Sequence, residues 1–179
     1  MPRLFTALEI PDDIARDLAL AQGGLAGARW IDAADYHITL RFIGDIDADL
    51  AHEIANALDG VRRPPLTVTL DGYDAFGGDR PRALIAKVKP TAELRELQAE
   101  HERLIRRAGV PPESRKFTPH VTLARLRRTP PRDAADWLAA RPVTARRTFE
   151  ASRFVLFSSR ASVGGGPYVV EAAYPLRSQ

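Results

Sequence analysis

The feature that most constrains this chain is a repeated order of expected elements, strand–helix–strand–helix–strand, in its two halves. The first copy places strands at 3–9, 35–43 and 65–76 and helices at 11–22 and 47–58, and the second places strands at 82–89, 119–126, 146–157 and 168–176 and helices at 91–108 and 131–140. The boundary lies near Gly77–Pro81, with no Pro/Ser/Gly linker. We therefore expect one α+β domain, 1–179, whose repeats, approximately 3–76 and 82–176, form two similar lobes that share a sheet or a tight cleft.

One histidine tetrapeptide occurs in each copy, in the second expected strand. It reads His37-Ile38-Thr39-Leu40 in the first copy and His120-Val121-Thr122-Leu123 in the second. Residues i and i+2 of a strand face the same side, so each histidine and its threonine point one way and their aliphatic neighbours point into a core. A single His-x-Thr in a strand is usually structural. Two copies at equivalent positions predict one shared site, which a pseudo-twofold arrangement of the lobes would assemble.

Two imidazoles and two hydroxyl groups around one site are suited to phosphoryl transfer. A neutral histidine can take a proton from the attacking hydroxyl, and a protonated histidine can give one to the leaving oxygen. This acid–base help is worth roughly 10²–10⁴-fold in rate. Threonine hydroxyls, together with an arginine, can hold the nonbridging oxygens as charge develops on them.

Motifs for other chemistry are missing or have a simpler interpretation. There is no HExxH, and no carboxylate is spaced with the strand histidines, so we expect no metal. The segment Gly164–Pro167 lacks the Lys-Ser/Thr of a phosphate-binding loop and is expected to be a hairpin turn, so ATP chemistry has no support. His52 and His101 lie in charged helical stretches and are expected on the surface.

Composition limits the redox chemistry and the compartment. The chain has no cysteine, which excludes disulfides, iron–sulfur clusters, thiolate zinc sites and a cysteine nucleophile, and fits a reducing cytoplasm. No stretch approaches the roughly 20 apolar residues of a membrane span. The first residues run directly into a strand pattern, so no signal peptide is expected.

The net charge of +3 is unevenly distributed along the chain. Residues 111–153 hold 10 basic and 4 acidic residues, whereas the remainder holds 16 basic and 19 acidic residues. The whole positive excess therefore surrounds His120, which predicts an anionic partner there. Arginine makes up 23 of the 26 basic residues, a bias that a GC-rich genome would also produce.

The doubled motif makes the chain resemble the two-histidine phosphoesterase superfamily. More narrowly, it is similar to the RNA 2',3'-cyclic phosphodiesterases of bacteria and archaea, also called 2'-5' RNA ligases. The residues that carry the likeness extend over nearly the whole chain: Arg3–Leu8, His37–Gly44, Pro81–Leu84, Phe117–Arg125, Leu156–Ser159, Tyr168 and Pro175–Leu176. The resemblance implies a bilobal fold, in which each lobe is an antiparallel sheet with outer helices and the active site lies in the cleft between them.

The resemblance also implies the reaction. The substrate would be RNA or a nucleotide that ends in a 2',3'-cyclic phosphate, hydrolysed to a 2'-phosphate by a monomer without metal or cofactor, and 2'-5' RNA ligation without ATP is related chemistry. By similarity, His120 would be the general base and His37 the general acid, although spacing alone leaves these roles open. Thr39 and Thr122 would bind the phosphate.

Further contacts to the substrate are expected from one arginine and one aromatic residue. Arg125 lies five residues after His120, an odd offset that nominally places it on the opposite face. The family pattern makes it a candidate phosphate ligand, and a bulge or strand end would turn it inward. Phe76 is the candidate to stack on the terminal base, whereas Phe42 follows Leu40 on the apolar face and is expected in the core. Upstream RNA phosphates are expected on a basic track: Arg115, Lys116, Arg127, Arg128 and Arg132.

Two other functions fit the same residues. The catalytic set would serve another cyclic or linear phosphodiester, such as ADP-ribose 1'',2''-cyclic phosphate, because pocket shape decides which ester enters. Alternatively, the basic surface would bind RNA ends without turnover, an interpretation that two intact histidines make less favourable.

Overall fold

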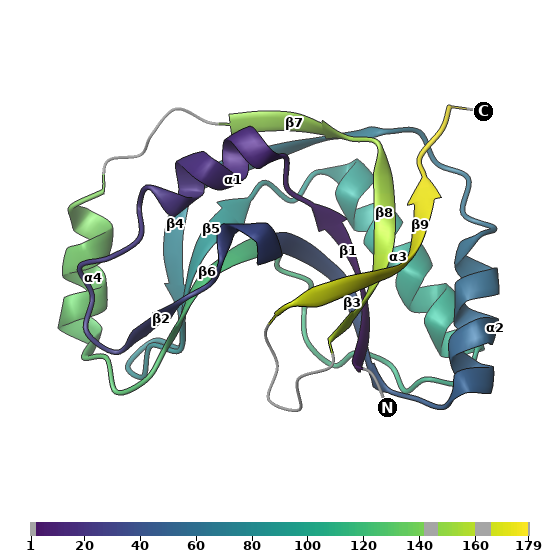
Figure 1. Ribbon diagram of the computed structural model, residues 1–179, viewed down its shortest axis with the longest axis horizontal. Coiled ribbons are helices and arrows are strands. Elements are labelled where there is room, and N and C mark those ends of the chain that lie inside the picture. The colour runs from purple at the N-terminus through teal and green to yellow at the C-terminus, as the bar shows by residue number, and fades with distance from the viewer. Residues whose placement is uncertain (1–2, 142–146, 160–165, 179) are drawn as a thin grey trace.

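The computed structural model describes residues 3–141, 147–159 and 166–178 (Figure 1). In chain order its elements are β1 (Arg3–Glu9), α1 (Asp12–Ala19), β2 (Ala28–Trp30), a 3₁₀ turn η1 (Ala33–Asp35), β3 (His37–Asp45), α2 (Ala48–Leu58), β4 (Leu66–Phe76), β5 (Ala83–Val88), α3 (Ala92–Arg107), β6 (His120–Leu126), α4 (Pro131–Ala139), β7 (Arg147–Ala151), β8 (Arg153–Ser159) and β9 (Tyr168–Pro175). Thr91 caps α3, as its position before the helix predicts, by accepting a hydrogen bond from the Leu94 N–H.

The strands form a single antiparallel sheet of nine strands that is nearly divided in the middle. Its order is β7-β4-β5-β6-β3-β1-β8-β9, and β2 also pairs with β6. β3 and β6 pair through one residue pair, Ile38 with Val121. We call β3, β1, β8 and β9 lobe 1, and β6, β5, β4, β7 and β2 lobe 2. The bilobal α+β fold with antiparallel sheets is therefore confirmed, and each lobe takes strands from both halves of the sequence.

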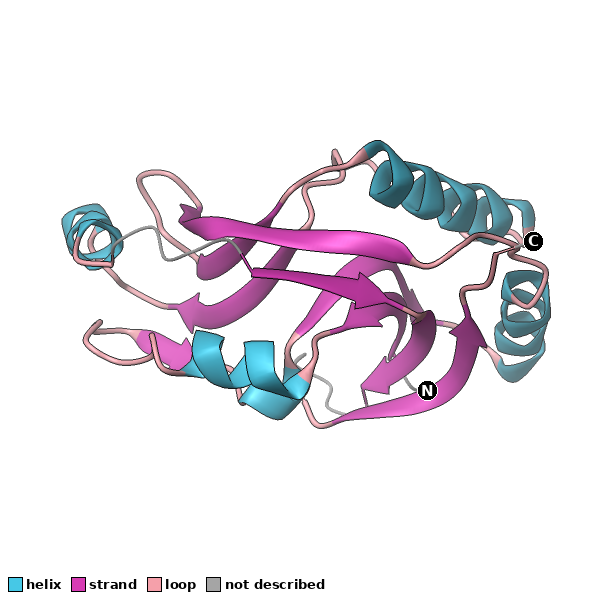
Figure 2. Cartoon of the chain, turned by 90° about the horizontal axis from the view of Figure 1, so that it is seen from above, coloured by secondary structure: helices cyan, strands magenta, loops and turns pink. Residues whose placement is uncertain are grey.

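The four helices of the described residues cover one face of this sheet. Alternate strand residues such as Leu8, Ile38 and Val121 are fully buried and pack with helix residues such as Ile54 and Leu97 in one large core. Figure 2 shows the helices along the outside of the strands. Burial of this apolar surface stabilises the fold at about 25 cal/mol per Å². The opposite face of the sheet is left for other contacts.

Three local features differ from the sequence predictions or lie beyond them. The strand expected at 146–157 is two strands that meet at Ser152 and belong to different lobes, since β7 pairs with β4 and β8 pairs with β1. The short β2 and η1 were not predicted, because three-residue elements carry no periodicity. The turn expected at Gly164–Pro167 lies partly outside the described residues. No helix within the described ranges is long and apolar enough to span a membrane.

Candidate active site

The residue pair that joins the lobes also joins the two histidine motifs. Ile38 and Val121 are opposite each other, fully buried, and point into the core. Continued by one residue in either direction, this antiparallel register sets each histidine opposite the threonine of the other motif, His37 with Thr122 and Thr39 with His120. All four polar side chains therefore share the face away from the helices, which we call the site face.

A bulge in each motif strand turns the residue five positions after the histidine to the site face. The pairing of β3 with β1 skips Leu40, and the pairing of β6 with β5 skips Leu123. An extra residue of this kind reverses the alternation beyond it. Phe42 and Arg125 consequently occupy equivalent positions on the site face, which explains the odd offset of Arg125. The prediction that Phe42 packs in the core is wrong, since 42% of its surface is exposed.

Polar and aromatic contacts hold the His37 imidazole. Its Nδ1 donates a hydrogen bond to the backbone carbonyl of Asp35 at 2.8 Å. With the proton on Nδ1, the Nε2 of the neutral ring accepts a hydrogen bond from the Thr39 hydroxyl at 3.0 Å. The rings of Phe5 and Tyr168 have centroids 5.0 and 5.1 Å from that of the imidazole. His37 is therefore fixed in one tautomer and packs against two aromatic rings.

His120 is held by the same backbone device among different side chains. Its Nδ1 donates to the carbonyl of Thr118 at 2.7 Å, again two residues before the histidine. The ring of Phe76 lies edge-on to it, with centroids 4.8 Å apart. The Arg82 guanidinium lies 5.9 Å from the Phe76 ring centroid. The structure thus places the predicted aromatic candidate, Phe76, directly beside His120.

Both histidines are biased toward the neutral form. Burial, opposed by the hydrogen bond to Asp35 and assisted by the charges of His120 and Arg125, lowers the pKa of His37 to about 4. Burial also lowers the pKa of His120, assisted by Arg125 and Arg82 and opposed by the hydrogen bond to Thr118. Arg125 therefore acts electrostatically on both imidazoles, which places it near the centre of the site.

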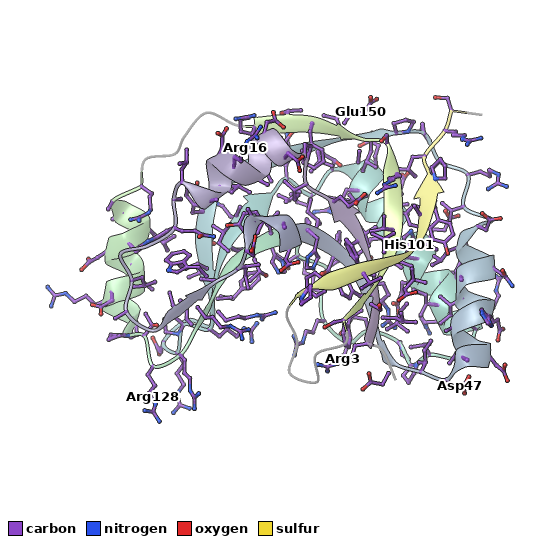
Figure 3. All side chains as sticks on the ribbon, in the orientation of Figure 1. Arg3, Arg16, Asp47, His101, Arg128 and Glu150 are labelled. Carbon is purple, nitrogen blue, oxygen red and sulfur yellow. The ribbon has the colours of Figure 1, made fainter. Side chains whose placement is uncertain are left out.

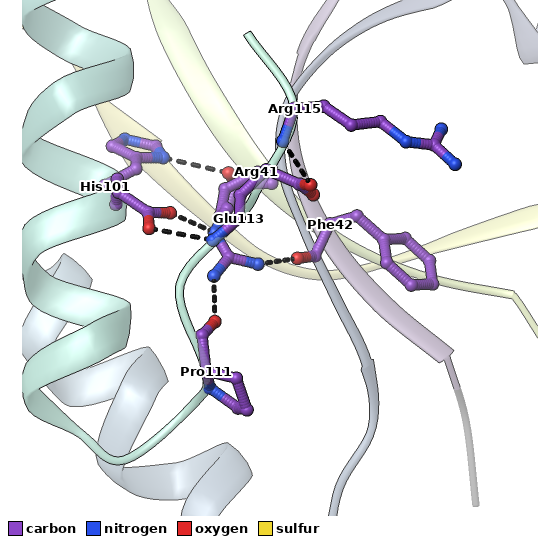
Figure 4. A network of polar contacts seen from close by, with 8 residues as sticks. Arg41, Phe42, His101, Pro111, Glu113 and Arg115 are labelled. Carbon is purple, nitrogen blue, oxygen red and sulfur yellow. Dashed lines mark hydrogen bonds and ion pairs between the residues drawn. The ribbon is translucent and has the colours of Figure 1, made fainter. Parts of the chain in front are cut away.

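The five residues of the predicted basic track do not lie together. Arg128 extends from the far tip of lobe 2 (Figure 3), and Arg132 lies in α4. Arg115 instead belongs to the segment that leads into β6, where its side chain extends to the same side as the Phe42 ring (Figure 4). A nearer arginine is Arg29 of β2, which pairs with Arg125 across the strands.

A buried arginine holds the segment before β6 against β3. Arg41 donates to the Glu102 carboxylate on α3, to the carbonyl of Pro111 at 2.6 Å, and to the carbonyl of Phe42 (Figure 4). Only 5% of the Arg41 side chain is exposed, and its charge is paired. The network fixes the backbone on which Phe42 is presented and anchors the chain that leads to His120.

The comparison with protein families gives one clear result. A family model described as LigT like Phosphoesterase matches the chain at residues 8–86 and again at 85–168. The chain belongs to the LigT-like phosphoesterase family. The two matches fall one in each half of the chain, in keeping with the doubled order of elements.

Relatives of this LigT-like phosphoesterase include proteins called RNA 2',3'-cyclic phosphodiesterase. The one from Aeropyrum pernix is 40% identical over 99 residues, which cover 54% of this chain and 56% of that protein. The one from Bacillus subtilis is 31% identical over 130 residues, which cover 69% and 71%. The one from Escherichia coli is 26% identical over 170 residues, which cover 93% and 92%. The match therefore spans little more than half the length of the Aeropyrum protein.

Solved structures share the LigT-like fold over the full chain. A crystal structure of a phosphoesterase superimposes with a TM-score of 0.81 at 23% identity, covering 99% of both chains. E. coli LigT complexed with 3'-AMP gives a TM-score of 0.76 at 22% identity, covering 99% of this chain and 100% of that one. At these identities the likeness establishes the fold.

One histidine of this LigT-like phosphoesterase was misplaced by the sequence prediction. His101 is completely buried on α3, where Nδ1 lies 2.9 Å from the Thr6 hydroxyl and the ring packs edge-on against Phe154. The charged neighbours along the helix concealed that His101 follows Leu94 and Leu97 on the buried face at helical spacing. His52, in contrast, is exposed on α2 as predicted.

Sequence reasoning also missed the residues that support His37. Asp35 accepts the hydrogen bond of His37 through its backbone, and its carboxylate accepts one from the Tyr168 backbone N–H. A side chain at position 166 would collide with the Asp35 carboxylate unless that carboxylate moved, so Gly166 lets the chain pass close beside it. No sequence motif predicts the contacts of Asp35 with Gly166 and Tyr168, since these residues are more than 130 positions apart.

Proposed function

We propose that this LigT-like phosphoesterase hydrolyses the 2',3'-cyclic phosphate at the end of an RNA or nucleotide to a 2'-phosphate. His120 takes a proton from water, and the water oxygen forms the new bond to phosphorus. The bond from phosphorus to the 3'-oxygen breaks, and His37 gives its proton to that oxygen. Thr39 and Thr122 hold the nonbridging oxygens, while Arg125 stabilises the charge that develops on them.

The observation that carries the proposal is that two histidines on one face of the sheet make the same hydrogen bond to the backbone. In each, Nδ1 is occupied by the backbone carbonyl two residues earlier, which leaves Nε2 as the atom for proton transfer. The β3–β6 register sets each histidine opposite a threonine hydroxyl. Two such imidazoles can serve one phosphate as base and acid from opposite sides.

The acid role requires that His37 be protonated when substrate is bound. With a pKa of about 4, free His37 is neutral near pH 7. A bound phosphodiester brings a negative charge, which favours the imidazolium form and raises the pKa. Substrate binding would thus charge His37 at the moment when its proton is needed.

The names of the relatives support the substrate class. The proteins from Aeropyrum, Bacillus and Escherichia are each called RNA 2',3'-cyclic phosphodiesterase. The lack of cysteine supports a reducing cytoplasm as the compartment. We propose in addition that the enzyme acts as a monomer without a metal, and that Phe76 stacks on the terminal base.

A product assay tests the proposal. Purified protein in EDTA is given an end-labelled oligonucleotide with a 2',3'-cyclic phosphate, and we expect a 2'-phosphate rather than a 3'-phosphate. His37→Ala and His120→Ala should each lower turnover by about 10²–10⁴-fold. His52→Ala, at an exposed histidine of α2, is the control and should match the wild type. Full turnover in both site variants would refute the proposal.

The same site could join RNA as well as hydrolyse its ends. A 5'-hydroxyl in place of water would give a 2'-5' linkage without ATP, because one phosphate ester bond is exchanged for another and the release of ring strain favours the open product. Incubation of a cyclic-phosphate RNA with a 5'-hydroxyl RNA, followed by analysis for a 2'-5' bond, tests this activity separately.

A further inference from the structure

Lobe 2 presents an exposed lysine beside His120. The site-face residues of β5 lie opposite those of β6, as the pairs Ala83–Arg125, Ile85–Thr122 and Lys87–His120. Ala83 and Ile85 are buried, whereas Lys87 is exposed. Cross-strand partners share a face of the sheet. Lys87 is therefore the charged residue of β5 that lies at the edge of the site, next to His120.

The equivalent position in lobe 1 carries a charge that is already neutralised. Glu9 of β1 lies opposite His37, as Lys87 lies opposite His120. Its carboxylate accepts two hydrogen bonds from Arg153, at 2.7 Å from Nε and 3.0 Å from Nη2. The pseudo-symmetry of the backbone is thus broken by charge, and the unneutralised cation lies on the His120 side.

The remaining lysines of the chain lie near the same place. The sequence contains Lys87, Lys89 and Lys116 and no other lysine. The N–H of Val88 donates to the carbonyl of Pro119 at 3.2 Å, which holds the end of β5 against the segment that leads into β6. All three lysines are exposed, and none forms an ion pair with another residue of the described ranges. They are available to an external anion.

The position of these lysines favours one side of the reaction. Displacement at phosphorus is in line, so the attacking oxygen enters on the His120 side when His37 protonates the leaving oxygen. A water molecule is neutral, so it needs no cation on this side. An RNA strand that attacks through its 5'-hydroxyl is charged, because its first backbone phosphate lies one nucleotide beyond the reacting oxygen. Lys87 lies opposite His120 and forms no ion pair within the described residues, which leaves its charge for this more distant phosphate.

We propose that Lys87, supported by Lys89 and Lys116, binds the backbone phosphate of an RNA strand whose 5'-hydroxyl replaces water at His120. This inference rests on the proposed function and names the residues of the same site that recognise the strand with the 5'-hydroxyl. In the joining direction the 5'-oxygen bonds to phosphorus, His120 takes its proton, and the 3'-oxygen leaves with the proton of His37. In the reverse direction His37 takes the proton of the 3'-hydroxyl, the 3'-oxygen bonds to phosphorus, and the 5'-oxygen leaves with a proton from His120.

Three substrates separate this role from the hydrolytic one. The first is 2',3'-cyclic AMP, the second is a 2'-5'-linked diadenosine monophosphate, and the third is that dinucleotide with an added 3'-phosphate on its downstream nucleoside. Lys87→Ala should lower kcat/KM for the third substrate alone by about 5-fold, the value of one solvent-exposed ion pair. Lys87→Glu should lower it further. For the third substrate, the slope of log(kcat/KM) against log[salt] should be smaller in magnitude by about 1 in Lys87→Ala than in the wild type. Arg106→Ala, at an exposed arginine of α3, should change none of these values.

Each other outcome decides against the inference. Equal losses on the second and third substrates would mean that Lys87 does not recognise the downstream phosphate. Unchanged values on the third substrate would exclude Lys87 as its ligand. Hydrolysis of cyclic AMP without cleavage of either 2'-5' linkage would show that the site accepts no nucleotide in place of water. Absence of cyclic AMP hydrolysis in the wild type would instead refute the proposed function.

Discussion

Lobe 1 and lobe 2 hold their histidines by the same hydrogen bond to the backbone but surround them with different side chains. In both lobes the histidine donates to the carbonyl two residues earlier, and a bulge three residues later turns one more side chain to the site face. That side chain is Phe42 in lobe 1 and Arg125 in lobe 2. The rings of Phe5 and Tyr168 flank His37, whereas His120 has the Phe76 ring at its edge and the charge of Arg82 beside it, and the charge of Arg125 acts on both imidazoles.

The layer behind the site differs as well. In lobe 1 the core face carries Thr6, bonded to His101, and the buried Arg41. The equivalent positions in lobe 2 are the buried apolar residues Leu84 and Ala124. The comparison teaches that backbone symmetry brings the two imidazoles together, while side-chain asymmetry gives them different tasks.

The largest expected effect would test the division between acid and base. A substrate whose leaving 3'-oxygen is replaced by sulfur needs no proton, because a thiolate is a good leaving group. On this substrate His37→Ala should regain most of its lost turnover, whereas His120→Ala should remain about 10²–10⁴-fold slow. Single-turnover rates of both variants on the oxygen and sulfur substrates measure the effect. Recovery of His120→Ala instead would reverse the two roles.

A smaller effect should separate the equivalent residues Phe42 and Arg125. Arg125→Ala should lower kcat by about 10²–10³-fold, because the arginine stabilises charge in the transition state. Phe42→Ala should leave kcat nearly unchanged, because a phenyl ring carries no charge to oppose the charge of the transition state and Phe76 is the ring proposed to stack on the base. Leu20→Ala, at a leucine that is 84% exposed, is the control. The comparison fails if the two substitutions change the same kinetic constant.

The smallest effect on activity is expected behind lobe 1. His101→Ala should leave kcat nearly unchanged and lower the free energy of unfolding by about 2–4 kcal/mol, because it leaves a cavity and removes the partner of the Thr6 hydroxyl. His52→Ala should cost less than about 0.5 kcal/mol. Urea unfolding at pH 7 measures both variants.

The same variant has a distinct pH signature. Burial lowers the pKa of His101 to about 3, below the 6.5 of an exposed histidine. Protons therefore bind the unfolded chain first, so the contribution of His101 is complete above pH 6.5 and is lost as the pH falls toward 3. His101→Ala should unfold with a shallower dependence on pH between these limits. An unchanged dependence would mean that His101 is not neutral in the folded protein.

The alternation of His37 with Ile38 and of His120 with Val121 was sufficient to predict which side chains share a face. It failed beyond Leu40, because a bulge has no signal in a single sequence, and so Phe42 was assigned to the wrong face. It also failed at His101, where charged neighbours outweighed the helical spacing of Leu94 and Leu97. The repeat predicted two similar lobes. It could not show that a strand from each half crosses to pair with the other.

The sequence by itself determined the chemical groups of this protein and the local strands that carry them. Each His-x-Thr motif lies among alternating apolar residues. Because side chains of a strand alternate between its two faces, this local pattern determines which residues share a face. Only the tertiary structure decided that one residue pair, Ile38 with Val121, joins the lobes and that Glu9, opposite His37, is paired with Arg153 while Lys87, opposite His120, forms no ion pair within the described residues. These outcomes depend on pairings between residues more than 80 positions apart, whose energies arise from packing across the sheet rather than from any one segment.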